Sequence, residues 1–320
     1  MTKPRVICTR KWPDAVEAVL QDRFDVTLNT ADKAMSQAEL RRAFDDFDAV
    51  CPTVTDKIDA EVLANPGRAK LCSNFGVGFN NIDVEAAKAA GLKVSNTPDV
   101  LTDATADIAL TLLLNVARRT YEGEQMLRGG QWTGWRPTQL MGTSPQGKTL
   151  GIIGMGRIGK AMAKRCHAAL DMNIVFYDAF PVADAGVPGA EQLETVDDVM
   201  AASDFVSLHC PGGGANTHLM NAERFAKMKP TAFLVNTARG DIIDEAALVA
   251  ALSSGQIAGA GLDVFEREPT ITPALMDMQN VCLLPHLGSA TTETREAMGM
   301  KVVDNLTAHF EDRELPDRVA

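Results

Sequence analysis

Short apolar runs alternate with amphipathic segments along most of the chain. In the first hundred residues five runs rich in aliphatic residues are predicted as strands: Arg5–Thr9, Asp25–Asn29, Ala49–Pro52, Lys70–Asn74 and Leu92–Ser95. Between them apolar positions recur at helical spacing, as in Asp14–Phe24, where Val16, Val19 and Leu20 share a face. Strands that alternate with helices are typical of βαβ units on a parallel sheet.

The same alternation begins again at Lys148. Six runs are predicted as strands there: Thr149–Gly154, Asn173–Asp178, Phe205–Cys210, Phe233–Thr237, Ala258–Val264 and Val281–Pro285. The gaps between them are predicted as helices, for example Arg157–Ala169 and Glu245–Ser254. Six strands with intervening helices match a doubly wound Rossmann sheet that binds a dinucleotide. The sequence therefore predicts two doubly wound α/β domains.

Two further helices indicate how the domains are connected. Leu101–Arg119 is predicted as a long, mostly apolar helix packed between the domains. Glu293–Phe310 is predicted as a helix that comes too late for the second sheet, so we expect it to return to the first domain. The predicted domains are residues 1–99 with 287–320, and residues 100–286. We expect the functional site in the cleft between them.

Composition narrows the function classes. The 320 residues are 46% apolar, and 31 basic against 42 acidic residues give a net charge of −11, which argues against nucleic-acid or membrane partners. The six cysteines form no C-x-x-C pair and have no histidine at metal-ligand spacing, so no metal is expected. Buried free thiols, the absence of a signal-peptide pattern and the absence of a membrane-length apolar stretch favour a cytoplasmic protein.

The motif Gly154-Met155-Gly156-Arg157-Ile158-Gly159 fits the pattern G-x-G-x-x-G. It follows a predicted strand and opens a predicted helix, which is the context that a dinucleotide-binding loop requires. Gly154 permits the tight turn, Gly156 lets the backbone approach the pyrophosphate, and Gly159 lets helix and strand pack closely. The helix N-terminus then offers N–H groups to the phosphates.

Asp178 indicates which nicotinamide cofactor is bound. It lies 19 residues after Gly159, at the end of the next predicted strand, where a carboxylate accepts hydrogen bonds from the ribose hydroxyls. No Arg or Lys occurs in the following residues 179–182, so a 2′-phosphate would meet an uncompensated negative charge. The pattern favours NAD, with NADH preferred over NADPH.

Three polar residues end or follow the later predicted strands. Arg239 follows Phe233–Thr237, Glu268 lies beyond Ala258–Val264, and His286 follows Val281–Pro285. Ligands of doubly wound folds bind outside the carboxyl ends of the strands, so these side chains should project toward one crevice. His286 can supply a proton, Glu268 can fix its tautomer and favour the imidazolium, and Arg239 can hold a carboxylate and polarise a ketone. This combination predicts reduction of a 2-keto acid.

These residues resemble the D-2-hydroxyacid dehydrogenase family over nearly the whole chain. The resemblance is carried by the phosphate loop and by four further motifs: Asn74–Asp83, Asn236–Asp241, Asp263–Pro269 and Pro285–Thr291. It implies a flavodoxin-like substrate domain formed by both chain ends, a Rossmann cofactor domain and a homodimer. Dimerisation is expected around residues 117–147, which include Trp132 and Trp135.

The resemblance also implies roles for individual residues. Arg239, Glu268 and His286 match the catalytic triplet, and Val77 and Gly78 match backbone amides that bind the substrate carboxylate together with Arg239. Asp263 matches a residue that meets the nicotinamide carboxamide. The positions implied to contact the cofactor are Thr105, Gly154, Gly156, Arg157, Ile158, Gly159, Asp178, Cys210, Pro211, Thr217, Thr237, Ala238, Arg239, Asp263, His286 and Gly288.

Within the family, residues 97–103 and 132–137 look most like glyoxylate/hydroxypyruvate reductases, so the expected substrate is glyoxylate, hydroxypyruvate or a similar small 2-keto acid. Two features depart from that group. Asp178 has no basic neighbour of the kind that binds NADP, and Thr138-Gln139 stands where animal reductases carry another tryptophan. Two alternatives stay open: a dehydrogenase for glycerate, a phosphonate or a larger 2-keto acid, and a non-enzymatic NADH-sensing scaffold like a corepressor.

Overall fold

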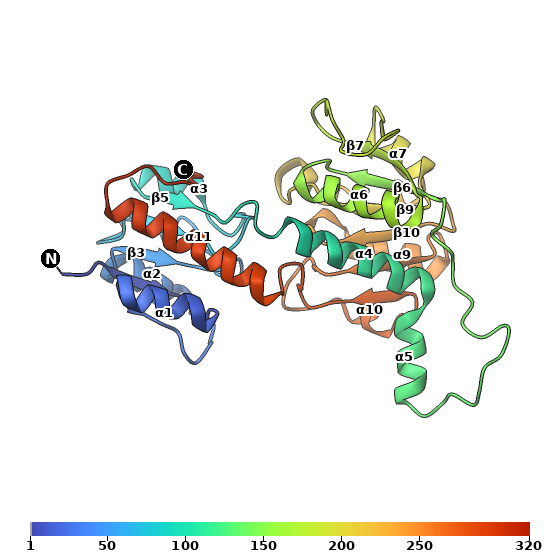
Figure 1. Ribbon diagram of the computed structural model, residues 1–320, viewed down its shortest axis with the longest axis horizontal. Coiled ribbons are helices and arrows are strands. Elements are labelled where there is room, and N and C mark those ends of the chain that lie inside the picture. Colours follow the sequence, from blue (N-terminus) through green and yellow to red (C-terminus); the bar gives the residue numbers. More distant parts are fainter. Residues whose placement is uncertain (1) are drawn as a thin grey trace. The chain divides into compact units, whose positions relative to one another are not determined.

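The computed structural model describes residues 2–320, which divide into two compact units (Figure 1). The first unit holds the chain up to Leu101 together with Ala290–Ala320, and the second holds Thr102–Ser289. Each unit is built on one parallel sheet with helices on both faces. The predicted fold class of two parallel-sheet α/β domains is confirmed.

The first unit has five strands in the order β2-β1-β3-β4-β5, which is the flavodoxin-like order. The strands are β1 (Arg5–Cys8), β2 (Asp25–Thr27), β3 (Ala49–Cys51), β4 (Leu71–Ser73) and β5 (Lys93–Ser95). The helices are α1 (Asp14–Arg23), α2 (Gln37–Asp46), α3 (Val84–Ala89) and α11 (Thr292–Phe310). The predicted helix near the end of the chain therefore does belong to the first unit.

Each face of this sheet buries its own apolar cluster. On one face α1 and α11 pack together, with Leu20, Val302 and Leu306 fully buried. On the other face α2 supplies Leu40 and Phe44. The last residues of the chain also bond to β5, because the N–H of Val94 donates to Ala320 and the N–H of Val319 donates to Val94.

The second unit has seven strands in the order β12-β11-β10-β9-β6-β7-β8. Counted along this unit, the order is 3-2-1-4-5-6 with a seventh strand at one edge, which is the Rossmann order. The strands are β6 (Thr149–Ile153), β7 (Asn173–Tyr177), β8 (Glu191–Gln192), β9 (Phe205–Leu208), β10 (Phe233–Asn236), β11 (Gly259–Leu262) and β12 (Val281–Leu283). All neighbouring strands are parallel, so their carboxyl ends meet at one edge.

Helices cover both faces of the larger sheet. They are α4 (Thr102–Arg118), α6 (Arg157–Leu170), α7 (Val196–Ala202), α8 (Ala222–Phe225), α9 (Glu245–Ser254) and α10 (Pro273–Asp277), whereas α5 (Thr120–Arg128) buries none of its residues. The helices α4 and α6 pack side by side on one face, whereas α7, α8 and α9 contribute to the cluster on the other (Figure 1). Among the described residues, no helix is both long enough and apolar enough to cross a membrane.

The structure differs from the sequence prediction at three places. All eleven predicted strands are present, but most end a residue or two early, because their last residues turn into the loops of the carboxyl edge. The strand β8 was not predicted, since its two residues are polar and exposed. The helix α5 was not predicted either. It follows Arg119, whose left-handed φ of 54° ends α4.

Candidate functional site

The loop Gly154–Gly159 joins β6 to α6 and is built around close backbone contacts. Gly154 has a φ of 94°, and a Cβ there would lie 2.6 Å from the backbone nitrogen of Cys210. A Cβ on Gly159 would lie 2.3 Å from the carbonyl oxygen of Gly154. At Gly156, by contrast, a Cβ would meet nothing within 4 Å, and no side chain caps α6. This space and the uncapped helix N-terminus fit the pyrophosphate of a dinucleotide.

Asp178 follows β7, and its carboxylate is fixed against this loop. Its Oδ2 accepts a hydrogen bond of 2.8 Å from the N–H of Met155, and its Oδ1 accepts one of 3.2 Å from the N–H of Phe180. Arg157 and Ile158 form the first residues of α6 beside it. A carboxylate held at this point is within reach of the ribose of a dinucleotide bound to the loop.

His286 and Glu268 form a hydrogen-bonded pair. The Oε2 of Glu268 lies 2.9 Å from the Nδ1 of His286, and the Oε1 accepts a hydrogen bond of 3.0 Å from the N–H of Phe265. Burial alone would raise the pKa of Glu268, but the hydrogen bond and charge of His286 and the Phe265 N–H together lower it. Because Nδ1 faces the carboxylate, Nε2 is the nitrogen left to exchange a proton.

Asp263 holds the backbone that carries His286. Its carbonyl accepts from the N–H of His286, and its two carboxylate oxygens accept from Leu287 at 2.6 Å and Gly288 at 2.8 Å. Burial raises the pKa of Asp263, although these N–H groups oppose the shift. The hydroxyl of Thr105 donates to the carbonyl of Gly288. These bonds hold His286 at a φ of 56°, a conformation that non-glycine residues seldom adopt.

Arg239 follows β10 and makes no ion pair with any residue in the described part of the chain. Its Nη1 donates to the carbonyl of Ala238 at 2.6 Å, and its stem packs so close to Gly212 that a Cβ there would lie 2.8 Å from the Cβ of Arg239. Burial lowers the pKa of Arg239, and the charges of Glu268 and Asp241 partly offset that effect. A half-buried guanidinium without an ionic partner is suited to bind an anion.

The turn beneath Arg239 is set by its neighbours. The fully buried Asn236 donates from Nδ2 to the carbonyl of Arg239 and accepts at Oδ1 from the N–H of Ala238. A Cβ at Gly240 would lie 1.9 Å from the carbonyl carbon of Phe265, so the loops after β10 and β11 are in direct contact. Thr237 is buried, and its hydroxyl has no partner among residues 2–320, which fits a ligand contact.

The loop after β9 carries three other residues of the predicted cofactor set. Burial raises the pKa of Cys210 to about 11. Asn216 donates to the carbonyl of Pro211 at 2.9 Å and so braces the turn, and Thr217 is exposed. The second unit thus carries all the predicted cofactor positions. Most of them, with the triplet Arg239, Glu268 and His286, lie in loops that follow its strands, whereas Thr105 lies in α4 and Arg157, Ile158 and Gly159 begin α6.

Val77 and Gly78 belong to the first unit, in the loop between β4 and α3. Both are half-buried, and their carbonyl oxygens accept hydrogen bonds from side chains of the same unit, Asn96 and Asn74. The predicted site residues therefore lie in both units, and the binding of a carboxylate at Val77 and Gly78 stays a prediction.

Sequence reasoning missed a residue that holds one of the loops with candidate catalytic residues. Glu245, in the first turn of α9, is buried, and its oxygens accept hydrogen bonds from the N–H of Glu266 at 2.8 Å and from the hydroxyl of Thr272. It therefore fixes the loop that carries Glu268. An acidic residue at a helix start is common, so nothing in the sequence distinguished Glu245 from an ordinary helix-capping acid.

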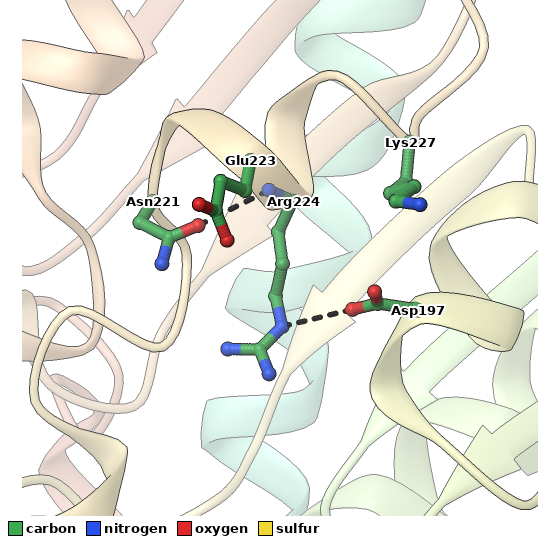
Figure 2. Close-up of a pocket in the computed structure, with 5 residues that line it drawn as sticks. All are labelled: Asp197, Asn221, Glu223, Arg224 and Lys227. Atoms are coloured by element: carbon green, nitrogen blue, oxygen red, sulfur yellow. Dashed lines mark hydrogen bonds and ion pairs between the residues drawn. The ribbon is translucent and has the colours of Figure 1, made fainter.

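Figure 2 shows a surface hollow whose polar groups serve the fold. Its lining residues are Asp197, Asn221, Glu223, Arg224 and Lys227. Asn221 caps α8 by accepting from the N–H of Arg224, and the guanidinium of Arg224 donates to Asp197 and to the carbonyl of Leu219. No predicted site residue lines this hollow. Within residues 2–320, no cluster of three or more His, Cys, Asp or Glu is arranged to hold a metal ion.

Comparisons with known proteins agree with this geometry. Residues 110–288 match the family model described as D-isomer specific 2-hydroxyacid dehydrogenase, NAD binding domain. The chain is 42% identical to a glyoxylate reductase of Thermococcus litoralis, over 98% of this chain and 96% of that protein. It is also 42% identical to a glyoxylate reductase of Pyrococcus furiosus, over 98% and 94%.

Solved structures give the same result for the fold. A glyoxylate reductase from Paecilomyes thermophila superposes with a TM-score of 0.88 at 33% identity, covering 100% of this chain and 99% of that one. An NADPH-dependent glyoxylate/hydroxypyruvate reductase from Sinorhizobium meliloti, in complex with NADP and malonate, gives 0.90 at 37%, covering 100% and 97%. The chain therefore belongs to the family of D-isomer specific 2-hydroxyacid dehydrogenases, and it is an oxidoreductase that uses a nicotinamide cofactor.

Proposed function

We propose that the protein reduces a small 2-keto acid, such as glyoxylate or hydroxypyruvate, to the D-2-hydroxy acid with NADH. The observation that carries this proposal is the His286–Glu268 pair, joined at 2.9 Å, in a unit that also holds the unpaired cation Arg239 and a dinucleotide loop. A proton donor, an anion-binding cation and a nicotinamide cofactor are what the reduction of a keto acid requires.

The proton chemistry follows from the tautomer. Glu268 occupies Nδ1 of His286, so Nε2 gives the proton to the carbonyl oxygen of the substrate. When bound, NADH supplies the hydride. In the reverse direction Nε2 takes the proton from the hydroxyl group of the 2-hydroxy acid, and Glu268 stabilises the imidazolium that forms. Asp263 keeps His286 in place by accepting hydrogen bonds from the N–H groups of His286 and of the two residues after it.

Arg239 and the first unit would bind the substrate carboxylate. Arg239 offers a planar, two-pronged donor that also polarises the ketone. In this proposal residues 1–99 and 287–320 act as the substrate domain, and the backbone amides of Val77 and Gly78 in that domain contact the same carboxylate. Residues 100–286 act as the cofactor domain. A carboxylate beside the reacting carbonyl is therefore the feature that the enzyme selects.

The preference for NADH rests on Asp178. Its carboxylate is fixed by Met155 and Phe180, so it cannot easily turn away from a 2′-phosphate. The like charge disfavours NADPH. The measurement is kcat/KM for both cofactors at one keto-acid concentration, and we expect NADH to be favoured at least roughly tenfold. Equal values, or a preference for NADPH of the kind named for the Sinorhizobium meliloti reductase, would contradict this part of the proposal.

The reaction is tested by following NADH absorbance with a panel of 2-keto acids. Glyoxylate and hydroxypyruvate should be the best substrates, and bulky 2-keto acids should be poor ones. Chiral chromatography of the product from hydroxypyruvate should give the D enantiomer. An L product would contradict the stereochemistry, and no turnover with any 2-keto acid would refute the proposed activity.

We further propose that the protein is a homodimer joined through residues 117–147. The helix α5 and the loop after it extend from the seven-stranded sheet in Figure 1, and they expose Tyr121, Leu127, Trp132, Trp135 and Met141. Trp135 is 80% exposed, which is unusual for so large an apolar side chain. Light scattering after size-exclusion chromatography should give a dimer, and replacing both tryptophans with serine should give a monomer.

A further inference from the structure

Three hydrogen bonds hold the loop Gly76–Phe79 by consecutive carbonyl groups. The carbonyl of Gly76 accepts from the N–H of Thr97 at 3.1 Å. The carbonyl of Val77 accepts from Nδ2 of Asn96 at 2.8 Å, and the carbonyl of Gly78 accepts from Nδ2 of Asn74 at 2.9 Å. Asn74 and Asn96 directly follow the paired strands β4 and β5, so both reach the loop from the carboxyl edge of the sheet.

Peptide geometry converts this arrangement into a row of donors. In a trans peptide the C=O and the following N–H point in opposite directions. If the carbonyls of Gly76, Val77 and Gly78 point into the unit, the N–H groups of Val77, Gly78 and Phe79 point out of it. None of these three N–H groups donates to an acceptor among the described residues. Successive outward N–H groups form an anion-binding concavity.

The orientation of the Asn74 amide is fixed by a third asparagine. Nδ2 of Asn81 donates to the carbonyls of Thr53 and Asp56, and this requirement sets which end of the Asn81 amide is the nitrogen. The same Nδ2 lies 3.3 Å from Oδ1 of Asn74, so the other end of the Asn74 amide must donate to Gly78. Asn74 is fully buried and cannot rotate freely.

The loop has no charge of its own. Residues 74–82 include no Lys or Arg, so any attraction for an anion at this point comes from oriented peptide dipoles. Such an attraction depends on alignment, because one peptide turned the other way would present a carbonyl oxygen to the anion. The groups that fix the carbonyls therefore control the strength of anion binding.

We propose that Asn74 and Asn96 are positioning residues that align three N–H groups, those of Val77, Gly78 and Phe79, into a cradle for the substrate carboxylate. The inference deepens the proposed function and rests on it for the identity of the anion. It adds a third donor, Phe79, to the two expected from sequence. It also implies that two asparagines control KM for the keto acid although they contact no substrate themselves.

The test compares Asn96→Ala and Asn96→Asp with the control Asn29→Ala. Asn96 is half-buried, so its replacement disturbs packing less than a change at Asn74 would. Asn29 is a matched control, because its Nδ2 also donates to backbone carbonyls, those of Thr9 and Lys33, but in another loop. Measured for each protein are KM and kcat for glyoxylate at saturating NADH, the Kd of NADH, the Tm, and the affinity of the NADH complex for oxalate by calorimetry.

In Asn96→Ala the loss of the Asn96 donor should raise KM for glyoxylate about 3- to 10-fold and should lower the affinity for oxalate by the same factor. The effect should be larger in Asn96→Asp, whose carboxylate repels the Val77 carbonyl and turns the peptide. In both variants kcat, the Kd of NADH and the Tm should stay close to the values for Asn29→Ala. Unchanged KM and oxalate affinity in both Asn96 variants would overturn the proposal, as would equal losses in every quantity, which would indicate a structural role only.

Oxalate separates this proposal from the proposed function. If the wild-type protein reduces no 2-keto acid but binds oxalate, and Asn96→Asp weakens that binding, the reductase proposal fails and the cradle stands. If the wild-type protein turns over glyoxylate and the Asn96 variants do so with unchanged KM, the cradle fails and the reductase proposal stands. A wild-type protein that neither turns over glyoxylate nor binds oxalate refutes both.

Discussion

The two units offer functional groups of different kinds. In the second unit the candidate reacting group is the side chain of His286, and the carbonyl and carboxylate of Asp263 hold the backbone that carries it. In the first unit the candidate binding groups are backbone N–H groups, and the side chains of Asn74 and Asn96 hold them. In both regions polar side chains hold the backbone, but one region places its candidate chemistry on a side chain and the other on backbone N–H groups.

This contrast predicts how each region responds to mutation. A reacting side chain can be deleted by one substitution, so changes in the second unit should remove whole catalytic functions. A backbone N–H cannot be deleted in this way, and substitutions in the first unit can only loosen its alignment. Losses of kcat should therefore cluster at Arg239, Glu268 and His286, and moderate increases in KM should cluster around the loop Gly76–Phe79.

The largest effect is expected at His286. Asparagine is the appropriate replacement, because it tolerates the left-handed φ of 56° better than alanine does. His286→Asn should lower kcat for reduction about 10²- to 10⁴-fold, the usual contribution of a positioned acid or base. Fluorescence titration should find NADH binding unchanged. A kcat within threefold of wild type would show that His286 is not the proton donor, and it would contradict the view that the second unit places its chemistry on a side chain.

Arg239→Lys should give the next largest effect. The charge stays, but the planar fork that matches a carboxylate is lost, so kcat/KM for glyoxylate should fall roughly 10²-fold. Steady-state kinetics with glyoxylate and a separate NADH titration provide the measurement. If the affinity for NADH falls strongly while KM for the keto acid is unchanged, Arg239 binds the cofactor instead of the substrate.

The Glu268→Gln variant tests the His286–Glu268 pair through pH. Reduction consumes a proton, so kcat/KM should fall with rising pH as the pair loses its proton, and the reverse oxidation should rise over the same range. The lowered pKa of Glu268 keeps its carboxylate charged throughout that range, and the charge favours the imidazolium. Without that charge the fall of kcat/KM for reduction should occur at lower pH. Coincident profiles would reassign Glu268 to a structural role.

The smallest effect is expected at a histidine that belongs neither to the His286–Glu268 pair nor to the loop Gly76–Phe79. Burial lowers the pKa of His209 from its ordinary 6.5 to about 4, and Ser207 is its hydrogen-bond partner at 2.9 Å. Between these two values the unfolded chain binds the proton more readily than the folded chain, so stability is lost as pH falls from 6.5 toward 4. His209→Asn should therefore show a shallower loss of Tm over that interval in thermal denaturation. Parallel Tm curves for the two proteins would exclude this linkage.

The sequence was sufficient for the strands, their order of occurrence and the motifs at their ends, because apolar runs and glycine patterns are local signals. It could not predict the bond from Asn96 to Val77, since the two residues are 19 positions apart and meet only after β4 and β5 pair. The same holds for Glu245, which supports a loop 21 residues away. Side chains that react have recognisable types and spacings, whereas side chains that support a backbone look like any other buried polar residue.

The division of the first unit between both parts of the chain has a consequence for biosynthesis. Residues 102–289 emerge from the ribosome before any of residues 290–320, so the second unit can fold while the chain is still being made. The first unit cannot complete its core until α11 has supplied Val302 and Leu306 to the cluster that contains Leu20. Its five strands are synthesised first, yet they are the last to be fully covered. A nascent chain stalled before Ala290 should therefore expose one face of the smaller sheet to chaperones.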